Sequence, residues 1–286
     1  MIMHFSVDDF IDAFLALKQG KYQSIFEQET FAVLKRVHEA CGAVFSCYCF
    51  YEAEGGSLAE VPGDYVQEFQ ANAAWLRFGF HGYDYNANYG SKKFSAGNWI
   101  DDAEVAAEHY NKVIGQLVRI TGGGRCIDRF PRIHYYAGTI ADCTAWKLAE
   151  YGICGLITAE DDRVCYYHEE EQWKTLIDKG FWRDETLQLG FWRTCIRLEN
   201  MKDEAMLDEA LSRLDIAPNA GEDAERDMQG AEPDIVRDNG NDSGNAYLVF
   251  THEKFLQEKR IEEYFLRCGK AAKERGIDCG YFYTLS

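Results

Sequence analysis

Strand-length apolar runs alternate with helix-length amphipathic segments along most of this chain. Short apolar runs bounded by turn signals are typical of buried strands, whereas apolar residues spaced three or four apart are typical of helices. The expected strands lack a polar face, as in parallel sheets that are covered on both sides. The alternation therefore predicts an α/β fold, and seven or eight strands favour a closed β/α barrel over an open sheet. We expect strands at residues 3–7, 43–51, 76–80, 126–136, 153–158, 193–198, 246–251 and 280–285.

Local signals mark the limits of several intervening helices. Asp101 and Asp102 precede a long amphipathic segment and Gly122 follows it, as is common for residues that cap the two ends of a helix. Gly42 ends an earlier amphipathic segment in the same way. We expect helices at residues 10–18, 65–72, 101–121, 140–151, 203–214 and 254–275, and a further one around 31–37.

We expect a single β/α-barrel domain over residues 1–286, with two departures from the alternation. Residues 163–190 are rich in aromatic side chains, which predicts inserted β-hairpins with short strands at 164–169, 175–177 and 180–183. Residues 215–245 are acidic and rich in Gly, Asp and Asn, which predicts a surface loop.

Charge and cysteine usage narrow the range of partners and compartments. A formal net charge of −18 argues against nucleic acid and anionic membranes as partners. The ten cysteines include no C-x-x-C pair, and most lie in apolar runs, as expected for reduced thiols. With no secretory signal and no apolar run long enough to span a bilayer, we expect a cytoplasmic protein. The sequence leaves a homo-oligomer open, and the aromatic residues fit either a saccharide groove or the core.

Chemically versatile side chains follow four of the expected strands. Asp8 and Asp9 end the first strand, His81 and His134 lie at or near the ends of two others, and His252 with Glu253 ends a fourth. The carboxyl ends of the strands in a β/α barrel share one face, so these residues should converge there. Two adjacent carboxylates repel each other unless a cation, a proton or water compensates them. Histidine nitrogens and a carboxylate oxygen together suit a divalent metal such as zinc.

Each of these residues also has a structural interpretation. Asp9 could cap a helix that starts at Phe10, and the 251–253 segment could cap the helix that follows it. A single histidine at a strand end is more often a packed, hydrogen-bonded residue than a metal ligand. The joint pattern favours a site, and both interpretations stay open at this point.

Four motifs in the chain resemble the polysaccharide deacetylase superfamily, the metal-dependent carbohydrate esterases with the NodB-type fold. Ser6-Val7-Asp8-Asp9 is similar to the T-F-D-D-like motif that ends the first strand in that family. Gly79-Phe80-His81-Gly82-Tyr83-Asp84-Tyr85 is similar to the first half of a G-x-H-[ST]-x-x-H motif. Arg132-Ile133-His134-Tyr135-Tyr136 has a weak similarity to an R-x-P-x-like segment, and Leu248 to Glu253 is similar to the last motif, an apolar strand that ends in histidine. The resemblance implies a distorted seven-stranded β/α barrel.

The same resemblance implies roles for individual residues. Asp8 would be the general base, Asp9 and His81 would bind the metal, and His252 would be the general acid that protonates the leaving amine. Tyr85 stands at the third ligand position, where a neutral phenol is a poor zinc ligand. Asp84 or His134 could replace it, and we favour His134 because a strand end holds a side chain more rigidly than a loop does. The residues expected to contact substrate are Arg132, Tyr136, Asp84, Tyr85 and Glu253.

The sequence therefore favours a metal-dependent hydrolase that deacetylates an N-acetylated sugar or a related amide, with zinc as the expected cofactor. One alternative is a carbohydrate-binding or assembly protein on the same barrel with a degraded catalytic site, because Tyr85 departs from the family motif. Another is a metal-dependent barrel hydrolase whose substrate is not a sugar.

Overall fold

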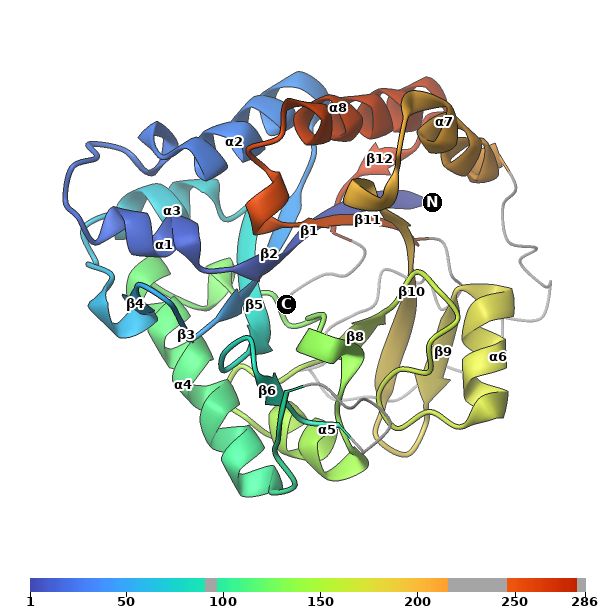
Figure 1. Ribbon diagram of the computed structural model, residues 1–286, viewed down its shortest axis with the longest axis horizontal. Coiled ribbons are helices and arrows are strands. Elements are labelled where there is room, and N and C mark those ends of the chain that lie inside the picture. Colours follow the sequence, from blue (N-terminus) through green and yellow to red (C-terminus); the bar gives the residue numbers. More distant parts are fainter. Residues whose placement is uncertain (91–96, 216–245, 282–286) are drawn as a thin grey trace, which may run out of the picture.

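The computed structural model describes residues 1–90, 97–215 and 246–281. A curved, mainly parallel sheet lies at its centre and helices cover its outer face (Figure 1). The strands of this sheet are β1 (Ile2–Phe10), β2 (Phe45–Phe50), β5 (Leu76–Gly82), β8 (Gly155–Thr158), β9 (Phe181–Asp184), β10 (Leu189–Arg197), β11 (Ala246–His252) and β12 (Asp278–Cys279).

Hydrogen bonds order these strands as β5-β2-β1-β11-β10-β8, with every pair parallel. Strand β12 adds to the start of β1, and β9 pairs with β10 in the antiparallel direction. Shorter strands form two separate pairs, β3 (Glu52–Ala53) with β4 (Gly56–Ser57), and β6 (Ala87–Asn88) with β7 (Asn98–Trp99).

The segment 127–131 fills the gap between the edge strands β5 and β8. The Asp128 N–H donates to the Phe78 carbonyl at 2.8 Å on one side, and the Ile157 N–H donates to the Pro131 carbonyl at 3.0 Å on the other. A single parallel bridge joins Phe78 to Ile127. This segment joins the two edge strands without being a strand itself, and the curled parallel sheet with its outer helices confirms the predicted distorted β/α barrel.

The prediction of a strand at 126–136 is wrong, because this segment does not form a regular strand. Apart from that bridge, the described backbone forms 3₁₀ turns at η3 (Gly124–Cys126) and η4 (His134–Tyr136). Pro131 has no N–H to give to a ladder, which disfavours a regular central strand here. The irregular path allows His134 to turn towards the strand ends.

Helices form where the amphipathic segments predict them, and one further helix forms at residues 170–179, where none was expected. They are α1 (Asp12–Leu17), α2 (Glu29–Cys41), α3 (Val66–Asn72), α4 (Ala103–Thr121), α5 (Ile140–Lys147), α6 (Glu170–Lys179), α7 (Glu204–Ser212) and α8 (Lys259–Glu274). The Asp102 side chain accepts the Glu104 N–H, and Gly122 ends α4 with φ +84°, as predicted from the sequence. Further 3₁₀ turns are η1 (Ile25–Glu27), η2 (Leu58–Glu60), η5 (Leu198–Asn200), η6 (Arg213–Asp215) and η7 (Glu253–Phe255).

The two irregular regions of the sequence have different outcomes. In the first, β9 and β10 form a hairpin, but helix α6 replaces the strand expected at 175–177, and no strand forms at 164–169. A capping box between Glu169 and Gln172 starts α6, and Trp173 and Leu176 are buried along it. Residues 216–245, which cover most of the predicted acidic loop, lie outside the described residues.

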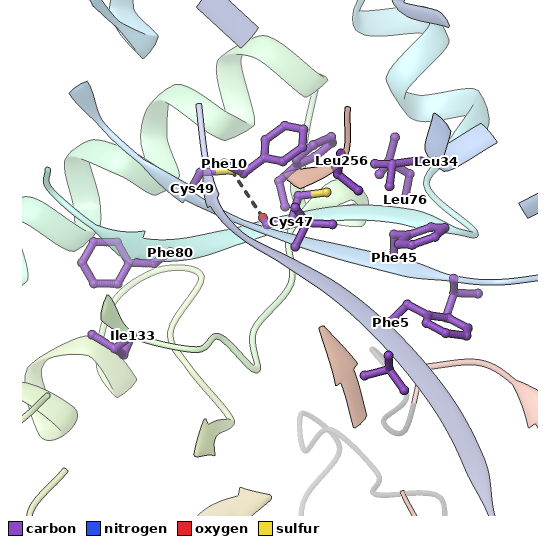
Figure 2. Close-up of a cluster of buried hydrophobic side chains, with 14 of the residues drawn as sticks. Phe5, Phe10, Leu34, Phe45, Cys47, Cys49, Leu76, Phe80, Ile133 and Leu256 are labelled. Carbon is purple, nitrogen blue, oxygen red and sulfur yellow. Dashed lines mark hydrogen bonds between the residues drawn. The ribbon is translucent and has the colours of Figure 1, made fainter. Parts of the chain in front are cut away.

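The core lies between the sheet and the helices. Phe5 and Phe45 pack against Phe265 of α8, and Phe10 packs against Phe31 of α2. Figure 2 shows the three strand residues among other buried apolar side chains. The barrel interior is different, because the opposite face of β1 carries His4, Ser6 and Asp8, all buried. Strand β1 therefore has a polar inner face, contrary to the expectation of apolar strands. In the described part of the chain, no helix is both long and apolar enough to cross a membrane.

Candidate functional site

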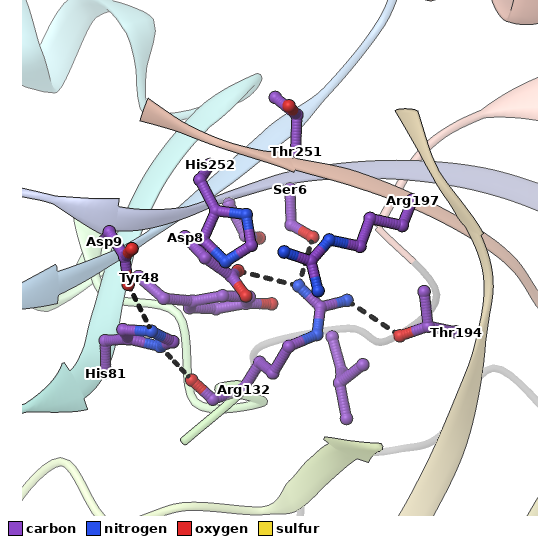
Figure 3. Close-up of polar contacts among 12 residues, drawn as sticks. Ser6, Asp8, Asp9, Tyr48, His81, Arg132, Thr194, Arg197, Thr251 and His252 are labelled. Carbon is purple, nitrogen blue, oxygen red and sulfur yellow. Dashed lines mark hydrogen bonds and ion pairs between the residues drawn. The ribbon is translucent and has the colours of Figure 1, made fainter. Parts of the chain in front are cut away.

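A backbone irregularity at the end of β1 brings two neighbouring carboxylates to one site. The pairing of β1 with β2 shifts register between Val7 and Phe10, and Asp9 has a left-handed φ of 55°. Side chains of consecutive residues point to opposite faces in a regular strand, and a bulge changes that direction. Asp8 contacts Arg132, and Asp9 contacts His81, whose ring in turn contacts the Arg132 carbonyl (Figure 3).

Asp9, His81 and His134 form a compact cluster at the carboxyl ends of the strands. Asp9 Oδ1 lies 3.1 Å from His81 Nε2 and 3.6 Å from His134 Nδ1. The two ring nitrogens are 3.2 Å apart. The structure thus brings together the residues expected from three segments far apart in the sequence, and any pair of these donor atoms lies within 4.8 Å.

Backbone carbonyls set the tautomer of both rings. His81 Nδ1 lies 2.6 Å from the Arg132 carbonyl, and His134 Nε2 lies 3.1 Å from the Tyr85 carbonyl. A carbonyl oxygen only accepts hydrogen bonds, so each of these nitrogens carries the proton. The remaining nitrogens, His81 Nε2 and His134 Nδ1, then present lone pairs to each other and to Asp9. Such ordering of a histidine by a second partner is common at metal sites.

The protonation tendencies of the cluster fit a bound cation. Burial lowers the pKa of His134 to about 3, so this ring is neutral at pH 7. Burial alone would lower the pKa of His81, but the adjacent carboxylates Asp9 and Asp8 raise it above its ordinary value. Burial would raise the pKa of Asp9, yet the hydrogen bond and charge of His81 hold it below its usual range. Three electron-pair donors that face one another favour a positive charge between them, which a proton on His81 or a metal ion can supply, and two imidazoles with one carboxylate are a donor set that zinc takes.

Arg132 lies beneath the cluster, fully buried. Its Nη1 donates to Asp8 Oδ1 at 2.7 Å and to Ser6 Oγ at 3.0 Å, and its Nη2 donates to Thr194 Oγ1 at 2.9 Å. Arg132 is 0% exposed and Asp8 is 2% exposed. Arg132, expected to contact substrate, is therefore the ion-pair partner of Asp8 inside the barrel, and its carbonyl orients His81.

His252 lies on the same rim, held by a carboxylate. It is the register partner of Asp8 across β1 and β11. Its Nδ1 lies 2.5 Å from Glu199 Oε1, and Glu199 Oε2 accepts a hydrogen bond from Thr251 Oγ1 at 2.8 Å. Figure 3 shows the ring of His252 above the Asp8–Arg132 pair. Asp9, His81 and His252 therefore meet on one face, as the strand-end rule predicted.

Glu199 was not among the residues predicted for the site. It directly follows the expected strand at 193–198, so the rule that found the other strand-end residues could also have found this carboxylate. Its side chain is 4% exposed. Burial raises its pKa, but the hydrogen bond from His252 and the charges of His252 and Arg197 outweigh this and lower the pKa to about 2.

Glu253 and Asp84, both expected to contact substrate, each bind backbone N–H groups in the fold. Glu253 is 4% exposed, and its carboxylate accepts the N–H groups of Ile11, Asp12 and Ala13 at 2.7–2.9 Å, so it caps α1. Burial raises the pKa of Glu253 to about 7, although these N–H donors act to lower it. Asp84 Oδ1 accepts the N–H groups of Asn86 and Ala87, both at 2.7 Å, which stabilises the loop after β5.

Of the two tyrosines named from the motifs, Tyr85 lies beside the cluster and Tyr136 lies near Glu160. The Tyr85 side chain is 57% exposed, and its ring centroid lies 5.1 Å from that of His134. The Tyr85 carbonyl also accepts a hydrogen bond from Tyr135 Oη at 3.1 Å. Tyr136 is buried, and its hydroxyl lies 3.5 Å from Glu160. Tyr135 and Tyr136 both have positive φ, 58° and 52°, a conformation that costs bulky residues roughly 1–3 kcal/mol each and often occurs at functional sites.

Comparison with known proteins gives matches to solved structures alone, since no family model and no curated protein matches this chain. A family 4 acetyl xylan esterase from Clostridium thermocellum, solved with a cobalt ion, aligns with 97% of this chain and 86% of its own at 8% identity and a TM-score of 0.43. The Xyl-CE4 domain of a multidomain xylanase from a Trinervitermes trinervoides hindgut metagenome aligns with 97% of this chain and 85% of its own at 9% identity and a TM-score of 0.41.

A third match is a Bordetella bronchiseptica protein described as a candidate polysaccharide deacetylase of O-antigen biosynthesis. It aligns with 95% of this chain and 90% of its own at 8% identity and a TM-score of 0.37. These structural neighbours are of the kind that the motifs resemble, at low sequence identity. Because all three TM-scores are below 0.5, the chemistry below rests on the geometry of this chain.

Proposed function

We propose that this protein is a metal-dependent hydrolase that removes the acetyl group from an N-acetylated sugar or a related amide. The observation that carries the proposal is the convergence of Asp9 Oδ1, His81 Nε2 and His134 Nδ1 within 4.8 Å of one another. A second acid, Asp8, and a carboxylate-bound histidine, His252, lie beside this cluster. Amide hydrolysis needs these parts: a place for a cation, a base and a proton donor.

Asp9, His81 and His134 would hold the divalent cation, and zinc suits their two nitrogens and one oxygen best. When bound, such a cation lowers the pKa of its water from about 16 towards 7 and polarises the acyl carbonyl. The fold already orients these donors, because the Arg132 and Tyr85 carbonyls hold the two rings with His81 Nε2 and His134 Nδ1 facing Asp9. Arg132 contacts His81 through its carbonyl and Asp8 through its side chain, so one residue links the cluster to the second acid.

Asp8 would act as the general base. Arg132 holds its carboxylate by a buried ion pair at 2.7 Å, which fixes the orientation of the oxygens that would accept a proton. As the water oxygen forms its bond to the acyl carbon, the water proton passes to Asp8.

His252 would act as the general acid. Glu199 binds its Nδ1 and so leaves Nε2 as the ring nitrogen available to the substrate. When the C–N bond breaks, the nitrogen takes a proton from His252 and leaves as an amine, while the acyl group leaves as acetate. A carboxylate that orients a histidine in this way also stabilises its protonated form.

The exposed ring of Tyr85 supports a sugar as the substrate. Among the large apolar side chains that are exposed in the described residues, Tyr85 is the aromatic one, and its ring lies against His134. An aromatic face beside the reacting groups offers apolar area and a hydroxyl to a pyranose ring. The idea of a degraded site came from Tyr85 standing at a ligand position. His134 supplies the third donor in place of Tyr85. The observation that favoured a protein that only binds carbohydrate therefore no longer supports it.

Metal analysis of the purified protein tests the proposal. We expect about one zinc per chain in the wild type, a loss of zinc in Asp9→Ala and in His134→Ala, and zinc-dependent acetate release from N-acetylated chito-oligosaccharides. Asp84→Asn is the matched control for the competing ligand, because the asparagine side chain can still accept the N–H groups of the loop. Zinc loss in Asp84→Asn with retention in His134→Ala would reassign the third ligand. A wild type that neither binds zinc nor releases acetate would contradict the proposal.

A further inference from the structure

Arg197, at the end of β10, contacts the same carboxylate oxygen as the proposed acid. Its Nε donates to Glu199 Oε1 at 2.7 Å, and His252 Nδ1 lies 2.5 Å from that oxygen. The second oxygen, Oε2, accepts the Thr251 hydroxyl. The guanidinium and the imidazole therefore share one acceptor atom.

Arg197 is a partly exposed cation between two acids. Its side chain is 24% exposed, and its Nη1 lies 3.7 Å from Glu160 Oε1. Figure 3 shows Arg197 reaching from its strand towards His252 and Arg132. No hydrogen bond or ion pair joins His252 to Asp9, His81 or His134 within the described residues. Among the described residues, Asp9 and His134 interact electrostatically with His252, and Asp8, Arg132, Arg197 and Glu199 lie around it.

A lone carboxylate on Nδ1 would hold the proton of His252 tightly, because an opposite charge favours the protonated ring. A general acid works best when its pKa is close to the working pH, so an imidazolium that is too stable is a poor donor. A guanidinium on the same oxygen offsets part of the carboxylate charge and repels the imidazolium. Arg197 is placed to exert both effects.

We propose that Arg197 is a positioning residue that acts through Glu199 to lower the proton affinity of His252. The part of Arg197 in catalysis rests on the function proposed above. Its effect on the proton affinity of His252 is a property of the folded chain and can be measured without turnover.

The test is an NMR pH titration of the histidine rings in the full chain, with and without added zinc. His252→Gln identifies the His252 signal by its disappearance. We expect Arg197→Met to raise the midpoint of His252 by about 0.5–1.5 pH units, and Arg197→Lys, which keeps the charge, to stay closer to the wild type. If Arg197→Met fails to fold, Arg197→Gln removes the charge while keeping a hydrogen-bond donor.

Arg193→Met is the matched control. Arg193 lies on the same strand, is 23% exposed and pairs with Asp162. It makes no contact with Glu199 or His252 among the described residues. This variant should leave the His252 midpoint unchanged.

An unchanged or lowered midpoint in Arg197→Met, or an equal rise in Arg193→Met, would overturn the inference. If the protein is active, the alkaline limb of kcat should move upward in Arg197→Met by the same amount. A wild type that binds no zinc and releases no acetate would remove the proposed function, while the titration would still decide the role of Arg197.

Discussion

At the scale of single residues, the site depends on which ring nitrogen of each histidine carries a proton. His81 and His134 each donate to a backbone carbonyl and keep the other nitrogen for the shared point near Asp9. A carbonyl is a fixed acceptor whatever the pH, so it determines which ring nitrogen of each histidine faces Asp9. Asp8 is set apart from this cluster by its ion pair with Arg132. The two neighbouring carboxylates can therefore have different roles, Asp8 as the proposed base and Asp9 as the proposed metal ligand.

Asp8→Asn tests that division. Asparagine keeps the shape and one carbonyl oxygen for Arg132, but it cannot act as a base. We expect zinc binding to persist and kcat for acetate release to fall by about 10²–10⁴-fold. Ser6→Ala is the control, because it removes one hydrogen-bond partner of Arg132 and leaves Asp8 charged. Full activity in Asp8→Asn, or loss of its zinc, would show that the roles of the two acids are misassigned.

Glu199 predicts a pH dependence of stability. Its pKa is lowered from an ordinary 4.5 to about 2 in the folded chain. The ionised carboxylate therefore stabilises the fold above pH 4.5, and this contribution is lost as the pH falls towards 2. It amounts to roughly 3 kcal/mol at most for a buried group. Denaturant unfolding at pH 7 and pH 3 should show a smaller acid loss in Glu199→Gln than in the wild type, and equal losses would refute it.

At the scale of elements, the ends of strands and short turns decide the site more than their interiors do. The register shift at Asp9 and the left-handed residues after His134 aim the side chains that regular elements would direct elsewhere. Strand-to-helix connections also carry structural contacts, since Glu253 from the end of β11 caps α1 after β1. One junction thus joins the two central strands of the barrel.

Glu253→Gln tests the importance of that cap. An amide leaves one acceptor oxygen for three N–H donors and adds an NH₂ group that faces them. We expect the free energy of unfolding at pH 8, where the carboxylate is ionised, to fall by about 1–3 kcal/mol. Glu258→Gln is the control, because Glu258 is 42% exposed and pairs with Arg260, and exposed pairs contribute about 0–1 kcal/mol. Equal effects in the two variants would mean that the α1 cap contributes little.

At the scale of the whole molecule, the barrel brings together side chains that lie far apart in the sequence, from Asp9 to His252. A ligand that binds this assembled site stabilises only the folded chain, because the unfolded chain has no such site. The net charge of −18 also favours uptake of a cation. The cytoplasmic location and the oligomeric state stay predictions.

Zinc should therefore raise the thermal stability of the wild type. At a free concentration one hundred times the dissociation constant, the gain is about 2.7 kcal/mol. Calorimetry with zinc and with chelator should show this difference in the wild type and in Asp84→Asn, and no difference in His134→Ala. A gain of the same size in His134→Ala would place the binding of zinc elsewhere.

Much of this arrangement was predictable from local patterns. Period and turn signals placed most of the central strands, the long helix after Asp102 and the barrel class, because each depends on neighbours in the chain. The same patterns failed at 126–136, where one proline and side-chain contacts replace a regular strand, and at 175–177, where a capping box starts a helix. Both errors arise where local propensity competes with tertiary packing.

The sequence by itself determined that Asp9, His81 and His252 stand at strand ends, and it named His134 with them although His134 lies in a 3₁₀ turn. Only the tertiary structure decided their partners. Arg132 forms a buried ion pair with Asp8, and Glu199 pairs with His252. Glu253 accepts hydrogen bonds from N–H groups at the start of α1. The physical reason is that strand ends follow from short-range periodicity, whereas hydrogen bonds between residues more than fifty positions apart depend on how the closed barrel sets the angle of each side chain.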